Sequence, residues 1–257
     1  YFSKNMHKNN YLSRTEQEIW GYISSKDIID NELLKLIFPD LSQNNRNKIL
    51  HSLFKKGYLK RASRDVYYNL NNLDDYYKLA LKIYPGYIGL TSALKYYNLI
   101  EYEDFTIFII TEKKYKTISL ENYTLKYLPL KELCTGFTGI RISTVEKTLF
   151  DCFLKIKYLN YSILTKAIYE AKDINWDEFL KYFEKAPKSL SQKAGYILNL
   201  MKKETNYKVS NHIIKQLKSK VKCPVKLENN SKPSIYSREW KVQDNIGKKI
   251  ILAWWYQ

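Results

Sequence analysis

The first part of the chain alternates apolar and polar positions with the period of short helices. Ser13 and Glu16 stand three positions apart, just before Ile19, Trp20 and Ile23, which recur at helical spacing. A serine and a glutamate placed in this way form a capping box at a helix N-terminus. The pattern therefore predicts a helix that begins at Ser13 and buries its apolar face.

Two further helices are predicted before the next glycine. The first runs from about residue 26 to 38 and ends there, because Pro39 pushes the preceding residue out of the helical region. The second begins at Ser42, whose hydroxyl can cap a helix, and runs to Lys56. Gly57 follows, a residue typical of helix C-termini.

The third helix has one apolar and one polar face. At about 100° per residue, one stripe collects the side chains that must pack inward, namely Ile49, Leu50, Leu53 and Phe54. The opposite face and its flanks carry amide and basic groups, namely Asn44, Lys48, His51 and Lys55 with Asn45 and Asn47 beside them. Arg46 falls near the edge of the apolar stripe, where it can pack or contact a phosphate.

After the third helix, runs rich in Tyr, Val and Leu flank Ser63, Arg64 and Asp65, which predicts a β-hairpin. Three helices and a hairpin are the order of a winged helix-turn-helix, whose third helix enters the DNA major groove. Asn and Gln can each form a bidentate pair with adenine. We therefore expect binding to double-stranded DNA through Gln43, Asn44, Asn45, Asn47, Lys48, His51 and Lys55, with phosphate contacts from Lys60, Arg61 and Arg64.

The remainder of the chain mixes strands and helices. Residues 71–84 predict a linking helix, and about 86–142 alternate short strands with small helices. Ser143 and Glu146 form a second capping box, which opens a helix that buries Val145, Leu149, Phe150, Phe153 and Ile156. In this interpretation Glu146 and Asp151 serve as helix cap and surface charge.

Residues 161–203 predict helices capped by Asn160 or Asn175, and strands return from about residue 221. The predicted fold is α+β, with a winged helix-turn-helix domain at 1–70 and a larger mixed domain at 71–257. Within the larger domain, 71–157 combines strands and helices, 158–220 is mainly helical, and the C-terminus returns to strands.

The chain of 257 residues carries a net charge of +17, which favours polyanionic partners, meaning nucleic acid or, less often, an anionic membrane surface. Residues 1–70 hold 12 basic and 7 acidic residues, 71–157 hold 12 and 10, and 158–257 hold 19 and 9. A uniform lysine-rich composition would explain the excess but not its concentration at both ends.

The most basic stretch, from Lys193 to Lys226, has nine lysines and a single acidic residue, Glu204. A polybasic helix can follow a phosphate backbone, so accessory contacts are expected from Lys202, Lys203, Lys215 and Lys218. The alternative is a solvated lysine face.

Other classes of protein are disfavoured. The longest apolar run, Ile250–Tyr256, is far shorter than a membrane span, and residues 1–10 are too polar and basic for a signal peptide. Cys134, Cys152 and Cys223 form no CxxC pair and do not cluster with the histidines. We therefore expect free thiols in a cytoplasmic protein, with no metal site, cofactor or membrane partner.

No nucleotide-binding or hydrolase motif is present, so no catalytic residue is assigned and the chain is not expected to be an enzyme. The alternative that stays open is a magnesium-dependent nuclease. Asp104 precedes the strand Phe105–Thr111, and Glu112, Lys113 and Lys114 follow it. Carboxylates hold Mg²⁺ in such enzymes and a lysine stabilises developing charge.

Several short motifs resemble the AbiEi antitoxin family, the regulators of type IV toxin–antitoxin systems in abortive infection. They are YPGYIGLTSALKYYNLI (84–100), FTIFIIT (105–111), KYKT, YTLKYLPL, GIRISTVEKTLFDCFL (139–154) and SREWKVQDN (237–245). The preceding segment KKGYLKRASRDVYY fits the family order, although Asp65 stands where members often carry glycine. The resemblance extends from about residue 12 to 246.

This resemblance implies a repressor of its own operon that binds an inverted repeat and neutralises a nucleotidyltransferase toxin encoded beside it. The larger domain would then carry the antitoxin activity. Two alternatives beside the nuclease stay open: a transcription regulator without a toxin, and a protein-docking or dimerisation module without DNA affinity.

Overall fold

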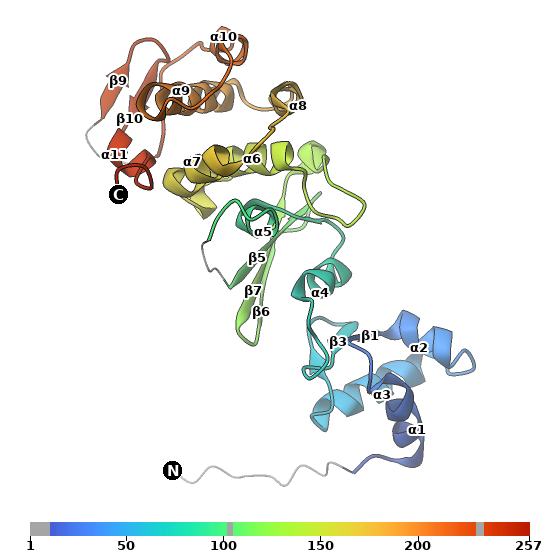
Figure 1. The fold of residues 1–257 in the computed structure, drawn as a ribbon. Helices are drawn as coiled ribbons and strands as arrows, with labels where there is room; N and C mark the ends of the chain where they lie inside the picture. Colours follow the sequence, from blue (N-terminus) through green and yellow to red (C-terminus); the bar gives the residue numbers. More distant parts are fainter. Residues whose placement is uncertain (1–10, 102–104, 230–233) are drawn as a thin grey trace. The chain divides into compact units, whose positions relative to one another are not determined.

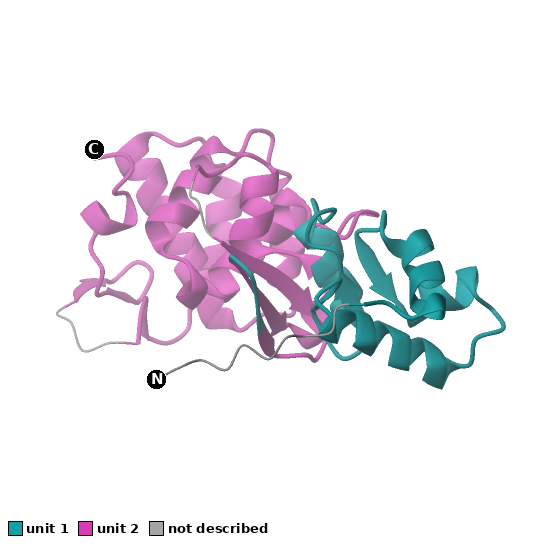
Figure 2. Ribbon diagram, turned by 90° about the horizontal axis from the view of Figure 1, so that it is seen from below, with its two compact units in different colours: residues 1–85, 118–122 teal, residues 86–117, 123–257 magenta. Residues whose placement is uncertain are grey.

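The chain folds into two compact units in the computed structural model, which describes residues 11–101, 105–229 and 234–257 (Figure 2). Unit 1 comprises the chain up to residue 85 together with 118–122, and unit 2 comprises 86–117 and 123–257. Both contain helices and sheets, so the predicted α+β class is confirmed. Within the described ranges, no helix is both long enough and apolar enough to cross a membrane.

Unit 1 packs α1, α2 and α3 against a three-stranded antiparallel sheet of order β1-β3-β2 (Figure 1). Its core consists of Ile19, Ile23, Ile29, Leu34, Leu50, Leu53, Leu59 and Tyr67. The elements are α1 (Arg14–Ile23), β1 (Ile28–Asp30), α2 (Asn31–Ile37), α3 (Gln43–Lys55), β2 (Lys60–Arg61), β3 (Val66–Tyr68) and α4 (Tyr76–Ile83).

The predicted helix boundaries in unit 1 are largely confirmed. Ser13 and Glu16 form both hydrogen bonds of a capping box, and the Ser42 side chain accepts from the Asn45 backbone at 3.3 Å. Gly57 follows the C-terminus of α3 with φ +86°, a left-handed conformation that a side chain would strain. Local capping chemistry alone was sufficient to place these ends.

The helix predicted over 26–38 is wrong in its first part. Ile28 and Ile29 form β1 instead and pair with Tyr68 and Tyr67 of β3. Asp30 then caps α2 by accepting from the Leu33 backbone at 2.8 Å. The partner strand lies far along the chain, so short-range periodicity could not distinguish this short strand from a helical turn.

A four-stranded sheet has the order β4-β5-β7-β6 (Figure 1). Its strands β4, β5 and β7 belong to unit 2, residues 118–120 of β6 are assigned to unit 1, and α5 packs against β5. β5 and β7 are parallel over their whole length, and β4 runs antiparallel to β5. The elements of this part are β4 (Tyr87–Ile88), α5 (Leu90–Tyr96), β5 (Thr106–Thr111), β6 (Lys116–Leu120), β7 (Tyr123–Pro129), the short 3₁₀ turn η1 (Lys131–Leu133) and α6 (Val145–Leu154).

The rest of unit 2 is helical and ends in a small sheet of order β8-β10-β9. Asn160 and Asn175 cap α7 and α8 as predicted, and α9 packs against β10 (Figure 1). The elements are η2 (Ile156–Tyr158), α7 (Tyr161–Glu170), α8 (Trp176–Tyr182), α9 (Lys188–Thr205), α10 (Asn211–Ser219), β8 (Val225–Lys226), β9 (Ile235–Ser237), β10 (Val242–Asp244) and α11 (Lys248–Ile251).

The segment before β10 packs closely against α9. A Cβ added to Gly195 would lie 2.2 Å from the indole of Trp240, which is 1 % exposed. The buried amide of Gln192 donates to the Trp240 carbonyl oxygen at 2.6 Å. These contacts hold the segment before β10 directly on the helix.

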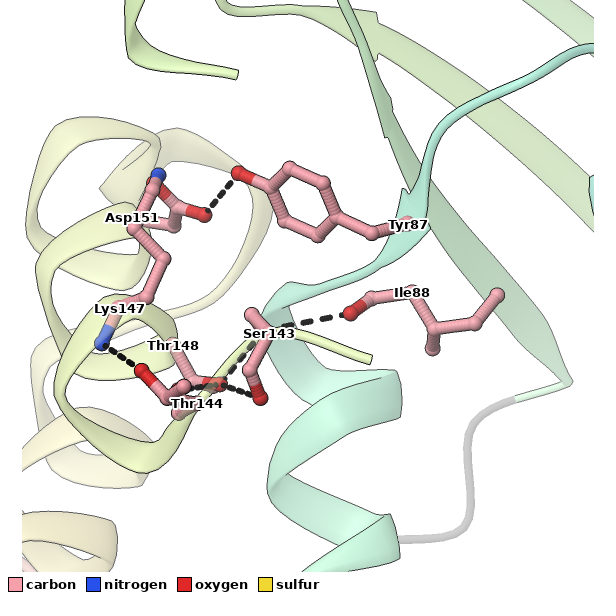
Figure 3. A network of polar contacts seen from close by, with 7 residues as sticks. All are labelled: Tyr87, Ile88, Ser143, Thr144, Lys147, Thr148 and Asp151. Carbon is pink, nitrogen blue, oxygen red and sulfur yellow. Dashed lines mark hydrogen bonds and ion pairs between the residues drawn. The ribbon is translucent and has the colours of Figure 1, made fainter. Parts of the chain in front are cut away.

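An ion pair lies in the core of unit 2 (Figure 3). Lys147 and Asp151, one helical turn apart on α6, are both 0 % exposed and paired with each other. Asp151 also accepts a hydrogen bond from the Tyr87 hydroxyl of β4 at 2.8 Å. The Lys147 ammonium contacts the rings of Tyr87, Phe150 and Tyr182, at 5.2 to 5.5 Å from their centroids.

Burial disfavours both charges of this pair. It raises the pKa of Asp151 and lowers that of Lys147, while the attraction between the two groups opposes both shifts. The prediction that Asp151 is a surface charge is therefore wrong. The helix face that carries Leu149, Phe150 and Phe153 also buries the charged positions between them, because the helices α5, α7, α8 and α9 pack around α6.

The capping box predicted at Ser143 and Glu146 is also wrong. Thr144 caps α6 by accepting from the Lys147 backbone at 3.3 Å. The buried Ser143 hydroxyl instead donates to the Ile88 carbonyl oxygen at 3.2 Å (Figure 3). Ser143 thus joins α6 to β4 rather than capping the helix.

Removing one member of the buried pair should destabilise unit 2 strongly. Lys147→Met or Asp151→Asn alone should each cost about 3–5 kcal/mol, because the remaining charge loses its partner in an apolar core. The double variant should cost clearly less than the sum of the two. Urea unfolding followed by tryptophan fluorescence measures all three, and additive penalties would contradict the coupling.

The exposed pair Lys181–Glu178 is a matched control for this cycle. It joins the same residue classes at 2.8 Å on the surface of α8. Lys181→Met should leave the unfolding midpoint nearly unchanged, because solvent screens exposed pairs.

Candidate nucleic-acid interface

Some of the polar residues predicted on α3 are exposed without a partner among the described residues, and others contact neighbouring side chains. Gln43, Asn44, Asn45, Lys48 and Lys55 are exposed. Within the described part of the chain, none of their side chains has a hydrogen-bond or ion-pair partner. α3 contains no acidic residue. Amide and ammonium groups on this surface are therefore available to a ligand with hydrogen-bonding edges and negative charge.

Asn47, by contrast, is held by α2. The Asn31 amide nitrogen, at the start of α2, donates to the Asn47 side-chain oxygen. The oxygen of Asn31 accepts from Arg46 Nε at 3.0 Å, and Arg46 also donates to the Leu41 carbonyl oxygen. Arg46 is 8 % exposed, so it connects α2, the turn and α3 instead of facing a ligand.

His51 is half-buried one turn further along α3. Its ring lies 6.1 Å from that of Phe54, measured between centroids. The inward stripe is as predicted, with Leu50 and Leu53 at 1 % and 0 % exposed. The exposed group therefore concentrates in the first half of α3 and recurs at Lys55.

The C-terminal half of α3 is fastened to α1. Lys56, the residue that caps α3, pairs with Glu16 at 2.5 Å. Burial alone would raise the pKa of Glu16, but hydrogen bonds from Lys56, Ser52 and Ser13 outweigh it and lower the pKa to about 2. One carboxylate thus caps α1 and anchors the end of α3, which sets the position of the exposed face.

The hairpin predicted around Arg64 is formed by β2 and β3, and its basic residues differ in their freedom. The Arg61 guanidinium donates to the carbonyl oxygens of Ser63 and Arg64, both at 2.9 Å, and so braces the turn. Lys60 pairs with Glu121 at 3.4 Å in a half-exposed geometry. Arg64 is exposed and, within the described ranges, has no acidic partner.

The accessory lysines predicted in the second unit are mostly occupied. Lys203 and Lys218 both approach Glu239, at 3.6 and 3.1 Å. Lys202 donates to the Asn211 side chain at 2.7 Å. Lys215 alone of the four is exposed without an ion pair among the described residues.

The residues of the nuclease alternative do not gather into a site in the described ranges. Glu112 and Lys113 are exposed beyond the end of β5 and pair with each other at 3.4 Å, and Lys114 is also exposed. Asp104 lies outside the described residues. Among those described, no three His, Cys, Asp or Glu side chains are grouped to hold a metal ion, and Cys134, Cys152 and Cys223 are free thiols.

Sequence reasoning missed Asn31 and Glu16 as positioning residues. Glu16 was recognised as a cap, but its bond to Lys56 joins positions 40 residues apart. Asn31 follows β1, a strand that the apolar pattern of the sequence did not predict. The one available signal was Arg46, a charged residue at the edge of an apolar stripe, which requires a buried partner.

Comparisons with known proteins bear on the fold alone. No protein-family model matches the chain, and no curated protein matches it. Among solved structures, the crystal structure of the RV2827C protein from Mycobacterium tuberculosis is similar, with a TM-score of 0.66. The match covers 97 % of each chain at 12 % sequence identity.

Glu16→Gln should destabilise unit 1 in a pH-dependent way. At pH 7 the loss of charge-assisted hydrogen bonds should cost about 1.5–3 kcal/mol. The native pKa lies below the usual value of about 4.5, so this stabilisation is present above pH 4.5 and lost as the pH falls toward 2. Urea unfolding read from ¹⁹F-labelled Trp20 should therefore show the penalty shrinking over that range.

Glu18→Gln is the control, since Glu18 is an exposed carboxylate on the same helix. It should change stability by less than about 0.5 kcal/mol at pH 7. A Glu16→Gln penalty of equal size at pH 7 and pH 2.5 would contradict the assigned role.

Proposed function

We propose that unit 1 is a winged helix-turn-helix that binds double-stranded DNA in a sequence-dependent manner. The observation that carries this proposal is the row of exposed amide and basic side chains on α3, which have no partner among the described residues, on a helix without acidic residues. α3 is the recognition helix in this proposal, and the β2–β3 hairpin is the wing.

The order of elements supports this assignment. In a helix-turn-helix the second helix of the motif enters the major groove and its N-terminal residues contact base edges. Gln43, Asn44 and Asn45 occupy those positions on α3, and amide side chains pair with adenine N6 and N7. Lys48 and Lys55 lie further along and would meet phosphate oxygens. Asn47 contributes less directly, since Asn31 already binds it.

The wing would add affinity that does not depend on sequence. Arg64 is the basic residue best placed for this, because it is exposed at the hairpin turn. Arg61 stiffens that turn, and Lys60 would exchange Glu121 for a phosphate. Each phosphate neutralised releases condensed counterions, so these contacts weaken as salt rises.

The motifs that resemble AbiEi antitoxins extend this proposal to the biological role. The chain would repress its own operon by binding an inverted repeat, and unit 2 would neutralise a cognate nucleotidyltransferase toxin in the cytoplasm. In unit 2 the segment similar to the family's strand-and-helix passage forms α6 and its buried Lys147–Asp151 pair. That passage supports the scaffold of unit 2 and leaves its surface to act on the toxin.

Asn44→Ala with Lys48→Ala should reduce affinity for the DNA upstream of the chain's own gene more than for a shuffled duplex. Each bidentate base contact contributes about 1–3 kcal/mol of discrimination, so a loss of ten-fold or more is expected on the specific site. Fluorescence polarisation at low and moderate salt measures both duplexes. Equal losses on both would remove the claim of base contact.

The matched control is Lys26→Ala with Asn71→Ala, which removes the same side-chain types from exposed positions outside α3 and the wing. Its affinity for both duplexes should stay within about two-fold of wild type. Wild-type binding that is equal on both sequences and disappears with salt would leave only non-specific electrostatic attraction.

Co-expression tests the antitoxin part of the proposal. The chain should restore growth of cells that express the nucleotidyltransferase encoded beside its gene. Asn44→Ala with Lys48→Ala should restore growth equally well when both genes are under foreign promoters, because the residues lie in unit 1. Failure of the wild-type chain to restore growth would contradict the antitoxin role while leaving DNA binding intact.

A further inference from the structure

Four lysines from separate segments of unit 2 meet at the start of α9. Lys188 is the first residue of α9, Lys220 and Lys222 follow α10, and Lys241 precedes β10. The Lys188 and Lys222 side chains lie close together. Lys241 Nζ donates to the Lys222 carbonyl oxygen at 2.8 Å. Segments far apart in sequence therefore place their ammonium groups together.

A buried amide fixes this arrangement. Gln192, 2 % exposed on the second turn of α9, donates from Nε2 to the carbonyl oxygens of Cys223, Trp240 and Lys241, at 3.0, 2.6 and 3.0 Å. The loop after α10 and the segment before β10 are both bound to α9 in this way. The cluster of Lys188, Lys220, Lys222 and Lys241, here the lysine cluster, is consequently built into the fold.

The lysine cluster is free of ion pairs within the residues that the structure describes, whereas nearby Lys203 and Lys218 share Glu239. The pKa of Lys188 is lowered, first by the close approach of the Lys222 side chain and then by the positive charges of Lys222 and Lys220. Like charges held together repel, and a bound anion removes that repulsion.

The helix itself adds to the positive potential. α9 has 18 residues, and its N-cap, Pro187, provides no side-chain hydrogen bond. The free N–H groups and the dipole of a helix N-terminus favour phosphate. Lys188 stands in that first turn, so the ammonium groups and the helix end act on the same space.

A hollow of about 430 Å³ opens beside the lysine cluster, between α8 and α10. Lys220 lines it and also contacts the Phe183 carbonyl oxygen at 3.4 Å, so the cluster and the hollow share a residue. Besides Lys220, its walls combine apolar side chains with carboxylates, an amide, a hydroxyl and a second lysine, namely Leu180, Phe183, Leu217, Asp177, Glu184, Gln216, Ser219 and Lys181.

The basic cluster and the hollow beside it favour a ligand that has an anionic group at one end and an apolar ring at the other. The carboxylates of the hollow repel phosphate, but they accept hydrogen bonds from the exocyclic amino group of a nucleobase. The apolar walls favour the flat ring of such a base. The volume is within the range of small-molecule sites. We propose that unit 2 binds a nucleotide, its phosphates on the lysine cluster and its base in the hollow. This inference is independent of the proposed DNA contact by unit 1.

Isothermal titration calorimetry of the full chain with ATP, pyrophosphate and adenosine tests the proposal. ATP should bind saturably, pyrophosphate more weakly, and adenosine least. Lys188→Gln with Lys222→Gln should weaken ATP binding at least ten-fold, because two charge-assisted phosphate contacts are lost. Asp177→Asn should change the affinity for ATP but not for pyrophosphate, since it lines only the hollow.

Lys208→Gln with Lys215→Gln is the charge-matched control, because both residues are exposed and lie outside the cluster. Its affinity for ATP should stay within about two-fold of wild type. Absence of saturable ATP binding, or equal losses in the two double variants, would overturn the proposal. Circular dichroism spectra and thermal midpoints confirm that each variant is folded.

Binding to a DNA duplex of random sequence distinguishes the two possible sources of phosphate, a free nucleotide and a nucleic-acid backbone. If Lys188→Gln with Lys222→Gln weakens duplex binding while ATP does not bind the wild-type chain, the cluster contacts a nucleic-acid backbone and the nucleotide assignment is wrong. Asn44→Ala with Lys48→Ala should bind ATP like the wild type. Failure of the DNA proposal and failure of the nucleotide proposal are therefore distinguishable.

Discussion

The Lys147–Asp151 ion pair is the interaction on which the order of unit 2 depends. Both charges are completely buried, so each requires the other, and the Tyr87 hydroxyl supplies the remaining hydrogen bond to the carboxylate. A buried charge without a partner is costly, which makes any packing that separates α6 from β4 unfavourable. The pair thereby specifies one arrangement of the sheet and its covering helix rather than simply adding stability.

The same principle operates at smaller scale in unit 1. Arg46 and Asn31 connect α2 to α3, and Glu16 and Lys56 connect α1 to the end of α3. These polar contacts use residues at the margins of α3. The exposed side chains between them have no partner in the part of the chain that the structure describes. A rigid helix with a free polar face is what sequence-dependent recognition of a base edge requires.

The excess positive charge is divided by the fold into paired and unpaired groups. Lys203, Lys218 and Lys248 are compensated by Glu239 and Glu204. Across the described ranges, the lysine cluster and the exposed lysines of α3 form no ion pair. Net charge alone predicted a polyanionic partner, whereas the tertiary arrangement decides which lysines stay unpaired among the described residues.

The helix ends and apolar faces could be derived from the sequence because they depend on neighbouring residues. Ser13, Ser42, Asn160 and Asn175 cap helices through backbone groups three residues or fewer away, and the stripe around Leu50 and Leu53 follows from a period of 3.6. The exposed amides of α3 were found in the same way.

What only the tertiary structure decided are the contacts between distant positions. β1 is a strand because β3 pairs with it, and Asp151 is buried because several elements enclose α6. Ser143 bonds Ile88 instead of capping α6, and Lys188 meets Lys222 only because Gln192 binds both later segments to α9. Short-range patterns carry no information on such pairs, since their energies arise from burial and from partners that folding brings together.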